Sequence, residues 1–302
     1  MKTLVTGAFP LTTEYRNELE KLGLDIMIHP DERILVEHPE IYEAVICNGL
    51  FLYNDISLFK ELKIIQLTSA GYDRVPMEYA EEHDIRVFNA GDAYSIPMAE
   101  FAIGGILQFY KQAPFFFKNR EEHRWEKHRG LRELYGKNAL IVGTGNVGFE
   151  IAKRLKAFGC DVTGVNRTPK HSPYFDKILP LEQLKSIVST ADIIVLAIAL
   201  TSETKHLLNA SLINLMKNDA LLVNISRGAL IDETALVDWL DHHSSTGVIL
   251  DVYETEPLDE TNPLWNYSNA ILTPHNSFVG EENTKRLENV FLKNFEKTKM
   301  DS

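Results

Sequence analysis

Short runs of apolar and β-branched residues alternate with longer amphipathic stretches along almost the whole chain. The stretches Thr13–Leu22 and Pro76–Glu82, for example, have helical spacing. Strands separated by helices predict βαβ units and a parallel sheet with both faces covered. In the first hundred residues the predicted strands are Leu4–Thr6, Leu24–Ile28, Ala44–Cys47, Lys63–Leu67 and Arg86–Phe88.

A second set of alternating elements begins near Ala139. Several of its strands are nearly uniformly apolar, which is typical of central strands buried on both faces of a sheet. The helical stretches Leu181–Val188 and Glu233–Asp241 have the length of crossover connections. This pattern predicts a doubly wound sheet. Its predicted strands are Ala139–Val142, Asp161–Val165, Ile193–Ala199, Leu221–Ile225, Gly247–Leu250 and Ala270–Thr273.

A long apolar helix and a charged, turn-rich stretch separate the two sets. The helix is predicted from about Ile96 to Ala113, because Pro97 suits a first helical turn and the residues after it are apolar on nearly every face. A C-terminal helix is expected from about Glu281. The fold class is therefore α/β, with two domains joined through the long apolar helix.

Composition and charge restrict the class of protein further. The chain has 302 residues, 44% hydrophobic and 25% charged, as in ordinary soluble proteins. A formal net charge of −12 argues against nucleic acid or an anionic membrane as the main partner. The opening MKTLVTGAFP lacks the apolar core of a signal peptide, and the run Ala191–Leu200 is shorter than the ~20 residues of a membrane helix. We expect a cytoplasmic protein.

The two cysteines and the histidines give no metal site. Cys47 and Cys160 stand in apolar surroundings, which favours buried free thiols over a disulfide or a zinc site. The histidines His123, His128 and the pair at 242–243 lie in charged or polar stretches without carboxylates or cysteines at ligand spacing. We expect no metal.

The strongest local motif follows the first strand of the second set. Ala139–Val142 runs directly into Gly143-Thr144-Gly145-Asn146-Val147-Gly148 and then into a helix. In a dinucleotide-binding turn the first glycine permits the bend, the second admits the pyrophosphate, and the third lets helix and strand pack closely. Framed by strand and helix, the motif favours a Rossmann-like dinucleotide site over a structural turn or a methyltransferase pocket.

The end of the next strand bears on the choice of cofactor. NAD-binding folds of this type carry an acid about 20 residues after the glycines, which binds the ribose diol. Here the strand ends in Val165 and is followed by Asn166, Arg167 and Thr168, with no carboxylate. A neutral Asn166 removes repulsion toward a 2′-phosphate, to which Arg167 and Thr168 can donate hydrogen bonds. We expect NADP(H), with NAD(H) as the alternative.

Polar residues follow three later strands of the second set. Ser226-Arg227-Gly228 comes after Leu221–Ile225, and the segment DVYETEP from Asp251 to Pro257 comes after Gly247–Leu250. His275 comes two residues after the strand that ends at Thr273. Ligands of open α/β sheets bind outside the carboxyl ends of the strands. An arginine, an acid and a histidine are therefore expected at one edge, together with the glycine loop.

Taken together, these segments resemble the D-isomer-specific 2-hydroxyacid dehydrogenases, a family that includes hydroxypyruvate/glyoxylate reductases, D-lactate dehydrogenases and phosphoglycerate dehydrogenases. The resemblance spans essentially the whole chain. It implies two Rossmann-like domains: a flavodoxin-like substrate domain of residues 1–96 plus 281–302 and an NAD(P)-binding domain of residues 97–280. The matching segments, in the order and spacing of the family, are Ser69–Asp73, Met98–Glu100, Gly143–Gly148, Leu200–Thr204, Asn224–Gly228, Asp251–Pro257 and Thr273–His275.

The resemblance also implies an activity and a set of catalytic residues. The activity is reversible hydride transfer between NADP(H), or NAD(H), and a small 2-oxo acid, giving a D-2-hydroxy acid. His275 resembles the acid/base, whose ordinary titration range suits proton exchange near neutral pH. Glu256 resembles its carboxylate partner, and Arg227 the planar clamp on the substrate carboxylate. Glyoxylate, hydroxypyruvate or a small apolar 2-oxo acid is the expected substrate.

Further residues are assigned to the ligands by the same resemblance. The backbone amides of Ala70 and Gly71 are expected to hold the substrate carboxylate. Leu50 is expected on the apolar side of the substrate pocket, or else in the core, and Phe278, where many members have small residues nearby, is expected to project into that pocket. The residues assigned to the cofactor beyond the glycine loop are Thr204, Ile225 and Asp251.

Two questions of assembly and class stay open at this stage. The aromatic run Phe115–Phe117 either fills the junction of the domains or faces a second subunit, and the resemblance favours a homodimer. A nicotinamide-sensing regulatory protein, similar to the corepressors related to this family, is the alternative to an enzyme. The presence of the full His, Glu and Arg set favours the enzyme.

Overall fold

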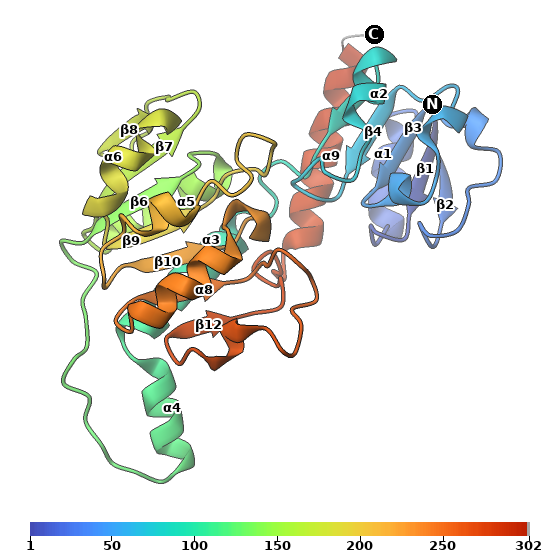
Figure 1. The fold of residues 1–302 in the computed structure, drawn as a ribbon. Helices are drawn as coiled ribbons and strands as arrows, with labels where there is room; N and C mark the ends of the chain where they lie inside the picture. The colour runs from blue at the N-terminus through green and yellow to red at the C-terminus, as the bar shows by residue number, and fades with distance from the viewer. Residues whose placement is uncertain (301–302) are drawn as a thin grey trace. The chain divides into compact units, whose positions relative to one another are not determined.

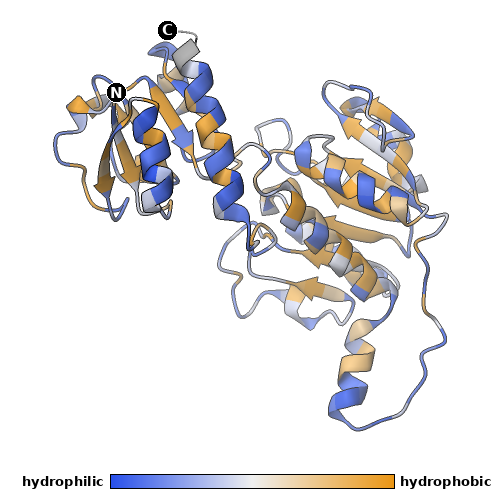
Figure 2. Cartoon of the chain, turned by 180° about the vertical axis from the view of Figure 1, so that it is seen from behind, coloured by the Kyte–Doolittle hydropathy of each residue, from blue (hydrophilic) through white to orange (hydrophobic). Residues whose placement is uncertain are grey.

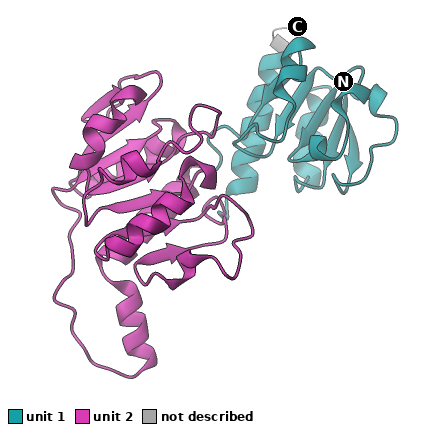
Figure 3. Ribbon diagram, in the orientation of Figure 1, with its two compact units in different colours: residues 1–94, 280–302 teal, residues 95–279 magenta. Residues whose placement is uncertain are grey.

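The computed structural model describes residues 1–300 and divides the chain into two compact units. Unit 1 consists of residues 1–94 and the chain from Gly280 onward, and unit 2 of residues 95–279 (Figure 3). Each unit contains one sheet whose paired strands all run parallel, with helices between them in sequence. The predicted α/β fold class is confirmed. The roles of the units toward substrate and cofactor stay predictions.

Unit 1 has a five-stranded sheet in the order β2-β1-β3-β4-β5. Its helices are α1 (Thr13–Lys21), α2 (Met77–Glu82) and α9 (Asn283–Met300). Leu287, Phe291 and Phe295 recur every four residues along α9 and are buried in the same cluster as residues of β1 and α1. The C-terminal helix is therefore an integral part of unit 1. The strands are β1 (Lys2–Thr6), β2 (Asp25–His29), β3 (Ala44–Cys47), β4 (Ile64–Leu67) and β5 (Arg86–Phe88).

Unit 2 has a seven-stranded sheet in the order β12-β11-β10-β9-β6-β7-β8. Its first strand, β6, lies beside both β7 and β9, so the order of the strands reverses there. Such a reversal opens a crevice for ligands at the carboxyl ends of the two strands. The strands are β6 (Asn138–Val142), β7 (Asp161–Asn166), β8 (Lys177–Pro180), β9 (Ile193–Leu196), β10 (Leu221–Asn224), β11 (Gly247–Leu250) and β12 (Ala270–Leu272).

Helices cover both faces of this sheet (Figure 1). Successive strand residues point to opposite faces, so Leu140 and Ile141 belong to different buried clusters. One cluster contains residues of α3 and α5, and the other contains residues of α6, α7 and α8. Figure 2 shows the resulting apolar strands. The helices are α3 (Ser95–Tyr110), α4 (Ala113–Glu121), α5 (Asn146–Ala157), α6 (Leu184–Ile187), α7 (Ala210–Ile213) and α8 (Glu233–His242).

The structure differs from the sequence prediction in several places, one of which is the strand predicted as Ile193–Ala199, which ends at Leu196. The apolar helix expected to reach Ala113 ends at Tyr110, because Gln112 adopts a left-handed φ of 54° and Pro114 starts α4 in its first turn. The stretch Leu181–Val188 is a short α-helix between two 3₁₀ turns rather than one helix. The edge strand β8 was not predicted, since it has only four residues and ends in a proline.

Cysteines, membrane spans and metal clusters can be checked directly. Cys47 and Cys160 are buried free thiols, as predicted, and burial raises the pKa of the Cys160 thiol to about 11. Within residues 1–300, none of the helices combines the length and the apolarity needed to cross a membrane. The described histidines, cysteines and carboxylates form no cluster of three or more that could hold a metal ion.

Candidate active site

The glycine loop joins β6 to α5 at the point where the strand order reverses. Gly143 has a φ of +102°, and a Cβ there would lie 2.3 Å from the Ala197 carbonyl oxygen. A Cβ at Gly148 would lie 2.0 Å from the Gly143 oxygen. Both positions therefore require glycine for backbone conformation or close packing. At Gly145, by contrast, a Cβ would meet no described atom within 4 Å.

Gly145 is also the N-cap of α5, and it has no side chain to accept hydrogen bonds from the first turn of that helix. The free amides of Asn146, Val147 and Gly148 therefore stand beside the open space at Gly145. An uncapped helix N-terminus with room beside its backbone suits a phosphate group, because the N–H groups and the helix dipole both favour negative charge. These residues fit the pyrophosphate of a dinucleotide.

The end of β7 is the second part of the candidate cofactor site. Asn166 donates a hydrogen bond from Nδ2 to Thr144 Oγ1 at 3.0 Å, and its Oδ1 accepts from the backbone N–H of Arg167 at 3.0 Å. Nη1 of Arg167 lies 3.5 Å from Oε2 of Glu203, and both side chains are exposed. Thr168 is exposed next to them. The sequence did not indicate that a carboxylate faces Arg167.

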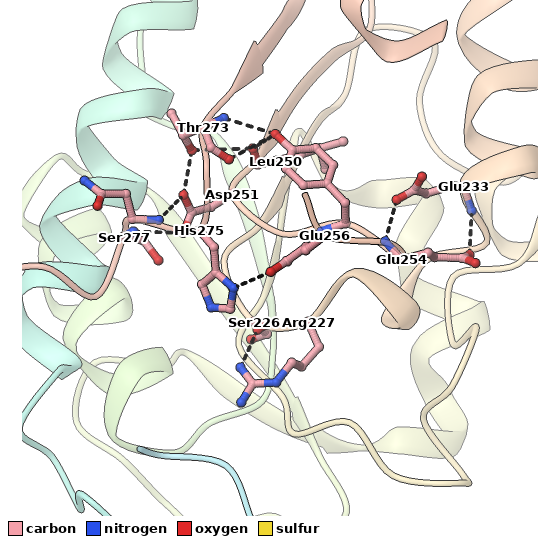
Figure 4. A network of polar contacts seen from close by, with 12 residues as sticks. Ser226, Arg227, Glu233, Leu250, Asp251, Glu254, Glu256, Thr273, His275 and Ser277 are labelled. Carbon is pink, nitrogen blue, oxygen red and sulfur yellow. Dashed lines mark hydrogen bonds and ion pairs between the residues drawn. The ribbon is translucent and has the colours of Figure 1, made fainter. Parts of the chain in front are cut away.

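His275 and Glu256 form the central pair of the candidate active site. Nδ1 of His275 lies 2.8 Å from Oε2 of Glu256 (Figure 4). The other carboxylate oxygen accepts the backbone N–H of Tyr253 at 3.1 Å, so Glu256 is held from two sides. His275 has a left-handed φ of 51°, which few residues other than glycine adopt. Its backbone N–H donates to the Asp251 carbonyl at 2.7 Å.

Asp251 fixes the turn that carries His275. Its side chain is fully buried, and Oδ1 accepts from the Thr273 hydroxyl at 2.7 Å and from the Asn276 backbone N–H at 2.8 Å. Oδ2 accepts from the Ser277 backbone N–H at 2.8 Å. Sequence reasoning missed this role, because the three donors come from a turn about 25 residues away. A contact between Asp251 and the nicotinamide stays a prediction.

The loop of Arg227 lies directly against the loop of Glu256. A Cβ at Gly228 would be only 1.8 Å from the Tyr253 carbonyl carbon, so the two backbones touch at this point. The Arg227 carbonyl accepts from Asn224 Nδ2 at 2.9 Å, and Nη1 of Arg227 donates to the Ser226 carbonyl at 2.8 Å. The structure thus brings together the loops after β10, β11 and β12.

Tyr253 is a residue of the candidate site that the sequence analysis did not single out. Its hydroxyl donates to the carbonyl of Leu250 or Thr273, at 3.0 and 3.1 Å, and accepts the Thr273 backbone N–H at 3.1 Å. Burial raises the pKa of this phenol to about 12, so it stays protonated and keeps its donor. Tyr253 therefore ties the end of β12 to the loop of Glu256.

Three other predicted site residues lie elsewhere in unit 2. Thr204 is buried, and its hydroxyl donates to the Ala199 carbonyl at 2.8 Å, within its own turn. Ile225 is a core residue of unit 2, which leaves its backbone as the part available to a cofactor. Phe278 is 40% exposed and lies edge-on to His275, with 5.9 Å between ring centroids. Contacts of these residues with ligands stay predictions.

The predicted substrate residues Leu50, Ala70 and Gly71 belong to unit 1. Leu50 is fully buried in the core of that unit, so the structure favours the core alternative, and Leu52 is the exposed side chain of the same turn. Ala70 and Gly71 follow β4, and their carbonyls accept hydrogen bonds from Asn89 and Ser69, respectively. These hydrogen bonds involve only the carbonyl oxygens. That the backbone N–H groups of Ala70 and Gly71 bind a substrate carboxylate stays a prediction.

Comparisons with known proteins agree with this arrangement. The family described as "D-isomer specific 2-hydroxyacid dehydrogenase, NAD binding domain" matches residues 103–277. A D-3-phosphoglycerate dehydrogenase of Methanocaldococcus jannaschii is 33% identical over 298 residues, which cover 94% of this chain and 55% of that protein. A glyoxylate reductase of Thermococcus kodakarensis is 31% identical over 296 residues, which cover 91% of this chain and 86% of that protein.

A solved structure extends the match to the whole fold. The D-isomer specific 2-hydroxyacid dehydrogenase family protein of Aeromonas salmonicida subsp. salmonicida superposes with a TM-score of 0.82 at 27% identity, covering 100% of this chain and 96% of that one. This chain spans about half the length of the two phosphoglycerate dehydrogenases that it matches. Since the matches include both units of the chain and the segment with the glycine loop, Arg227, Glu256 and His275, the chain belongs to the D-isomer-specific 2-hydroxyacid dehydrogenase family.

Proposed function

We propose that this protein transfers a hydride reversibly between a nicotinamide dinucleotide and a small 2-oxo acid, producing a D-2-hydroxy acid. The observation that carries the proposal is the 2.8 Å contact between His275 and Glu256. This pair lies next to the Arg227 loop on the sheet edge that also holds the glycine loop. An acid/base, an anion clamp and a dinucleotide cradle are the groups that such a reaction needs.

His275 is the proposed proton donor and acceptor. Because Nδ1 faces Glu256, Nε2 is the nitrogen left to exchange a proton with the substrate oxygen. In the reductive direction protonated His275 gives this proton to the carbonyl oxygen, and in the oxidative direction it takes the proton from the hydroxyl. The Glu256 carboxylate keeps the ring oriented and stabilises the imidazolium. A bound nicotinamide supplies or accepts the hydride.

Arg227 is the proposed clamp on the substrate. The planar guanidinium presents paired donors that match a carboxylate, and it is charged at every working pH. Since the Arg227 and Glu256 loops touch at Gly228, the clamp is held at a fixed distance from the acid/base pair. Glyoxylate, hydroxypyruvate and small apolar 2-oxo acids are the proposed substrates. The name of the glyoxylate reductase relative supports the first of these.

The test is the loss of reduced-nicotinamide absorbance with a panel of 2-oxo acids, using NADPH and NADH separately. We choose His275→Asn as the active-site variant, because asparagine tolerates the left-handed backbone at this position. Loss of a general acid is expected to lower kcat by about 10²–10⁴-fold. The control is His242→Asn, at the exposed end of α8. Bound cofactor without turnover on any 2-oxo acid would contradict the proposal.

We propose NADP(H) as the preferred cofactor. Support comes from the end of β7, where Asn166 carries no charge and the exposed guanidinium of Arg167 has only a solvent-screened partner in Glu203. A 2′-phosphate offers Arg167 a more highly charged partner than a single carboxylate does. Arg167→Ala is expected to reduce the NADPH-over-NADH ratio of kcat/KM by about tenfold, the value of one charge-assisted hydrogen bond. An unchanged ratio would refute this assignment.

We also propose that the protein is a homodimer. In unit 2, α4 extends away from the sheet, with the apolar start of the helix uncovered (Figures 1 and 2). Phe116 is 39% exposed and Trp125, in the following loop, is 98% exposed, and both line one surface hollow. Large aromatic side chains clustered on a surface in this way are typical of a protein interface. Light scattering after gel filtration is expected to give the mass of two chains, and the mass of one chain would refute the dimer.

A further inference from the structure

Two glutamates of the loop after β11 face two different histidines. Glu256 faces His275, as described above. Two residues earlier, Oε1 of Glu254 lies 3.0 Å from Nε2 of His206. The proposed reaction uses only the first of these pairs, so the second needs an explanation of its own.

His206 is held by its backbone in a sparsely populated conformation. Its φ is 50°, and its backbone N–H donates to the Ala229 carbonyl at 2.8 Å. Nε2 is buried, although the side chain as a whole is 38% exposed, and its N–H is not aligned with Glu254 for a regular hydrogen bond. Nε2 of His206 and the Glu254 carboxylate are therefore in close contact without a regular hydrogen bond between them. His206 ends the turn that also contains Thr204.

Glu254 is tied to the start of α8 as well. The backbone N–H of Glu233 donates to Oε1 of Glu254 at 3.1 Å, and the backbone N–H of Glu254 donates to Oε1 of Glu233 at 2.6 Å (Figure 4). The side chain and the backbone of Glu254 are thus both fixed against α8. This reciprocal arrangement, together with the His206 contact, gives the loop little freedom to slide along the sheet edge.

The restraint on Glu254 reaches both proposed catalytic loops. A Cβ at Gly228, next to Arg227, would lie 1.8 Å from the Tyr253 carbonyl carbon and 2.4 Å from the Glu254 nitrogen. On the other side, Tyr253 donates its backbone N–H to Glu256. A displacement of Glu254 therefore moves the Arg227 loop through direct backbone contact and disturbs the carboxylate that orients His275.

We propose that Glu254, paired with His206, is a positioning residue that holds the loops of Arg227 and Glu256 in register for the reaction. The inference rests on the proposed function and adds a residue pair to it. Neither side chain is proposed to touch substrate or cofactor. Since a misplacement of 1 Å costs up to about 100-fold in rate, a partial loosening of the loop is expected to lower kcat about tenfold. Cofactor affinity is expected to stay unchanged, because neither substitution alters the glycine loop or the end of β7, where the phosphates and the ribose are proposed to bind.

The experiment measures kcat per functional site, with sites counted by titrating the fluorescence of reduced cofactor. Glu254→Ala is expected to lose about tenfold in kcat, as is His206→Asn, whose new side chain tolerates the left-handed backbone. Glu254→Gln keeps an acceptor for Glu233 and is expected to recover most of the activity. The double variant is expected to be no slower than Glu254→Ala alone, because that change already removes the contact with His206. Glu260→Ala, an exposed glutamate of the same segment, is the control.

Each outcome separates the inference from the proposed function. Wild-type turnover with a tenfold lower kcat per site in both single variants, and with unchanged cofactor dissociation constants, supports the inference. Wild-type turnover with kcat per site unchanged in both variants refutes it, even where their thermal stability falls, since that pattern describes a merely structural pair. Fully additive losses in the double variant also refute it. No turnover in the wild type refutes the proposed function itself. If Glu254→Ala does not fold, the comparison of His206→Asn with wild type decides.

Discussion

Replacing Asp251 by asparagine tests how the turn that carries His275 is fixed. The carboxylate is fully buried and accepts from the Thr273 hydroxyl and from the backbone N–H groups of Asn276 and Ser277. Asparagine can place its single oxygen toward Thr273 and Asn276. Its NH₂ group then faces the Ser277 N–H, so that two donors meet in a buried site and neither is satisfied.

The free energy of this change follows from three contacts. An unsatisfied buried donor costs about 1–3 kcal/mol. The two contacts that survive lose the charge of the carboxylate and become roughly half as strong. Together these effects predict that Asp251→Asn lowers the free energy of unfolding by about 3 kcal/mol. The loss of orientation at His275 is expected to lower kcat as well.

Urea denaturation measures this loss directly, through the shift in midpoint at constant m-value. Asp232→Asn is a matched control, because Asp232 caps α8 by accepting the Ala235 N–H, and asparagine caps a helix about as well as aspartate. Its free energy of unfolding should change by less than about 0.5 kcal/mol. If Asp251→Asn were as stable as this control, the buried carboxylate would not be what fixes the turn.

Three further predictions follow from individual residues. Gly145→Ala should be as stable as the wild type but bind the dinucleotide more weakly, as measured by isothermal titration calorimetry. Gly143→Ala should unfold at a lower temperature, because its Cβ would clash with a backbone oxygen. Asp176→Asn should be less stable than wild type at neutral pH, and the difference should disappear in acid. The reason is that the hydrogen bond from Lys156 holds the pKa of the Asp176 carboxyl below its usual range. The stabilisation by this carboxylate is therefore present above pH ~4 and is lost as the pH falls through the lowered pKa. Urea midpoints measured from neutral pH into strong acid check this, and a difference that does not shrink as the pH falls would contradict it. Phe278→Ala should lower the KM for bulkier apolar 2-oxo acids with little effect on stability, since the ring is 40% exposed, and an unchanged ranking of substrates would exclude it from the pocket.

The parts of the fold and site that the sequence predicted are those with short-range signals. The glycine loop could be found because a strand, three glycines and a helix follow one another within a few residues. The polar residues after β10, β11 and β12 could be placed on one edge because parallel strands end on the same side of a sheet. Both predictions depend on backbone geometry that local sequence determines.

The parts that sequence could not predict depend on contacts between distant residues. Leu50 has the same apolar character whether it lines a pocket or fills a core, and only the packing of unit 1 shows that it is buried. The partners of Asp251 lie in a turn far along the chain, and the Glu203 carboxylate faces Arg167 across 36 residues. The break between α3 and α4 combines Pro114, which the sequence shows, with a left-handed Gln112, which no spacing rule indicates.

The order of the strands in unit 2 has a consequence for how the site is assembled. The loops of Arg227, Glu256 and His275 follow β10, β11 and β12, which are consecutive in the chain and adjacent in the sheet. The spacing between these loops is therefore set by the hydrogen-bond ladder, at about 4.8 Å per strand, and not by the docking of remote segments. During synthesis the ribosome delivers the glycine loop early and His275 last among them. A nascent chain thus contains the proposed dinucleotide cradle well before the proposed acid/base, and β12 is the last strand needed to bring the three loops to one edge.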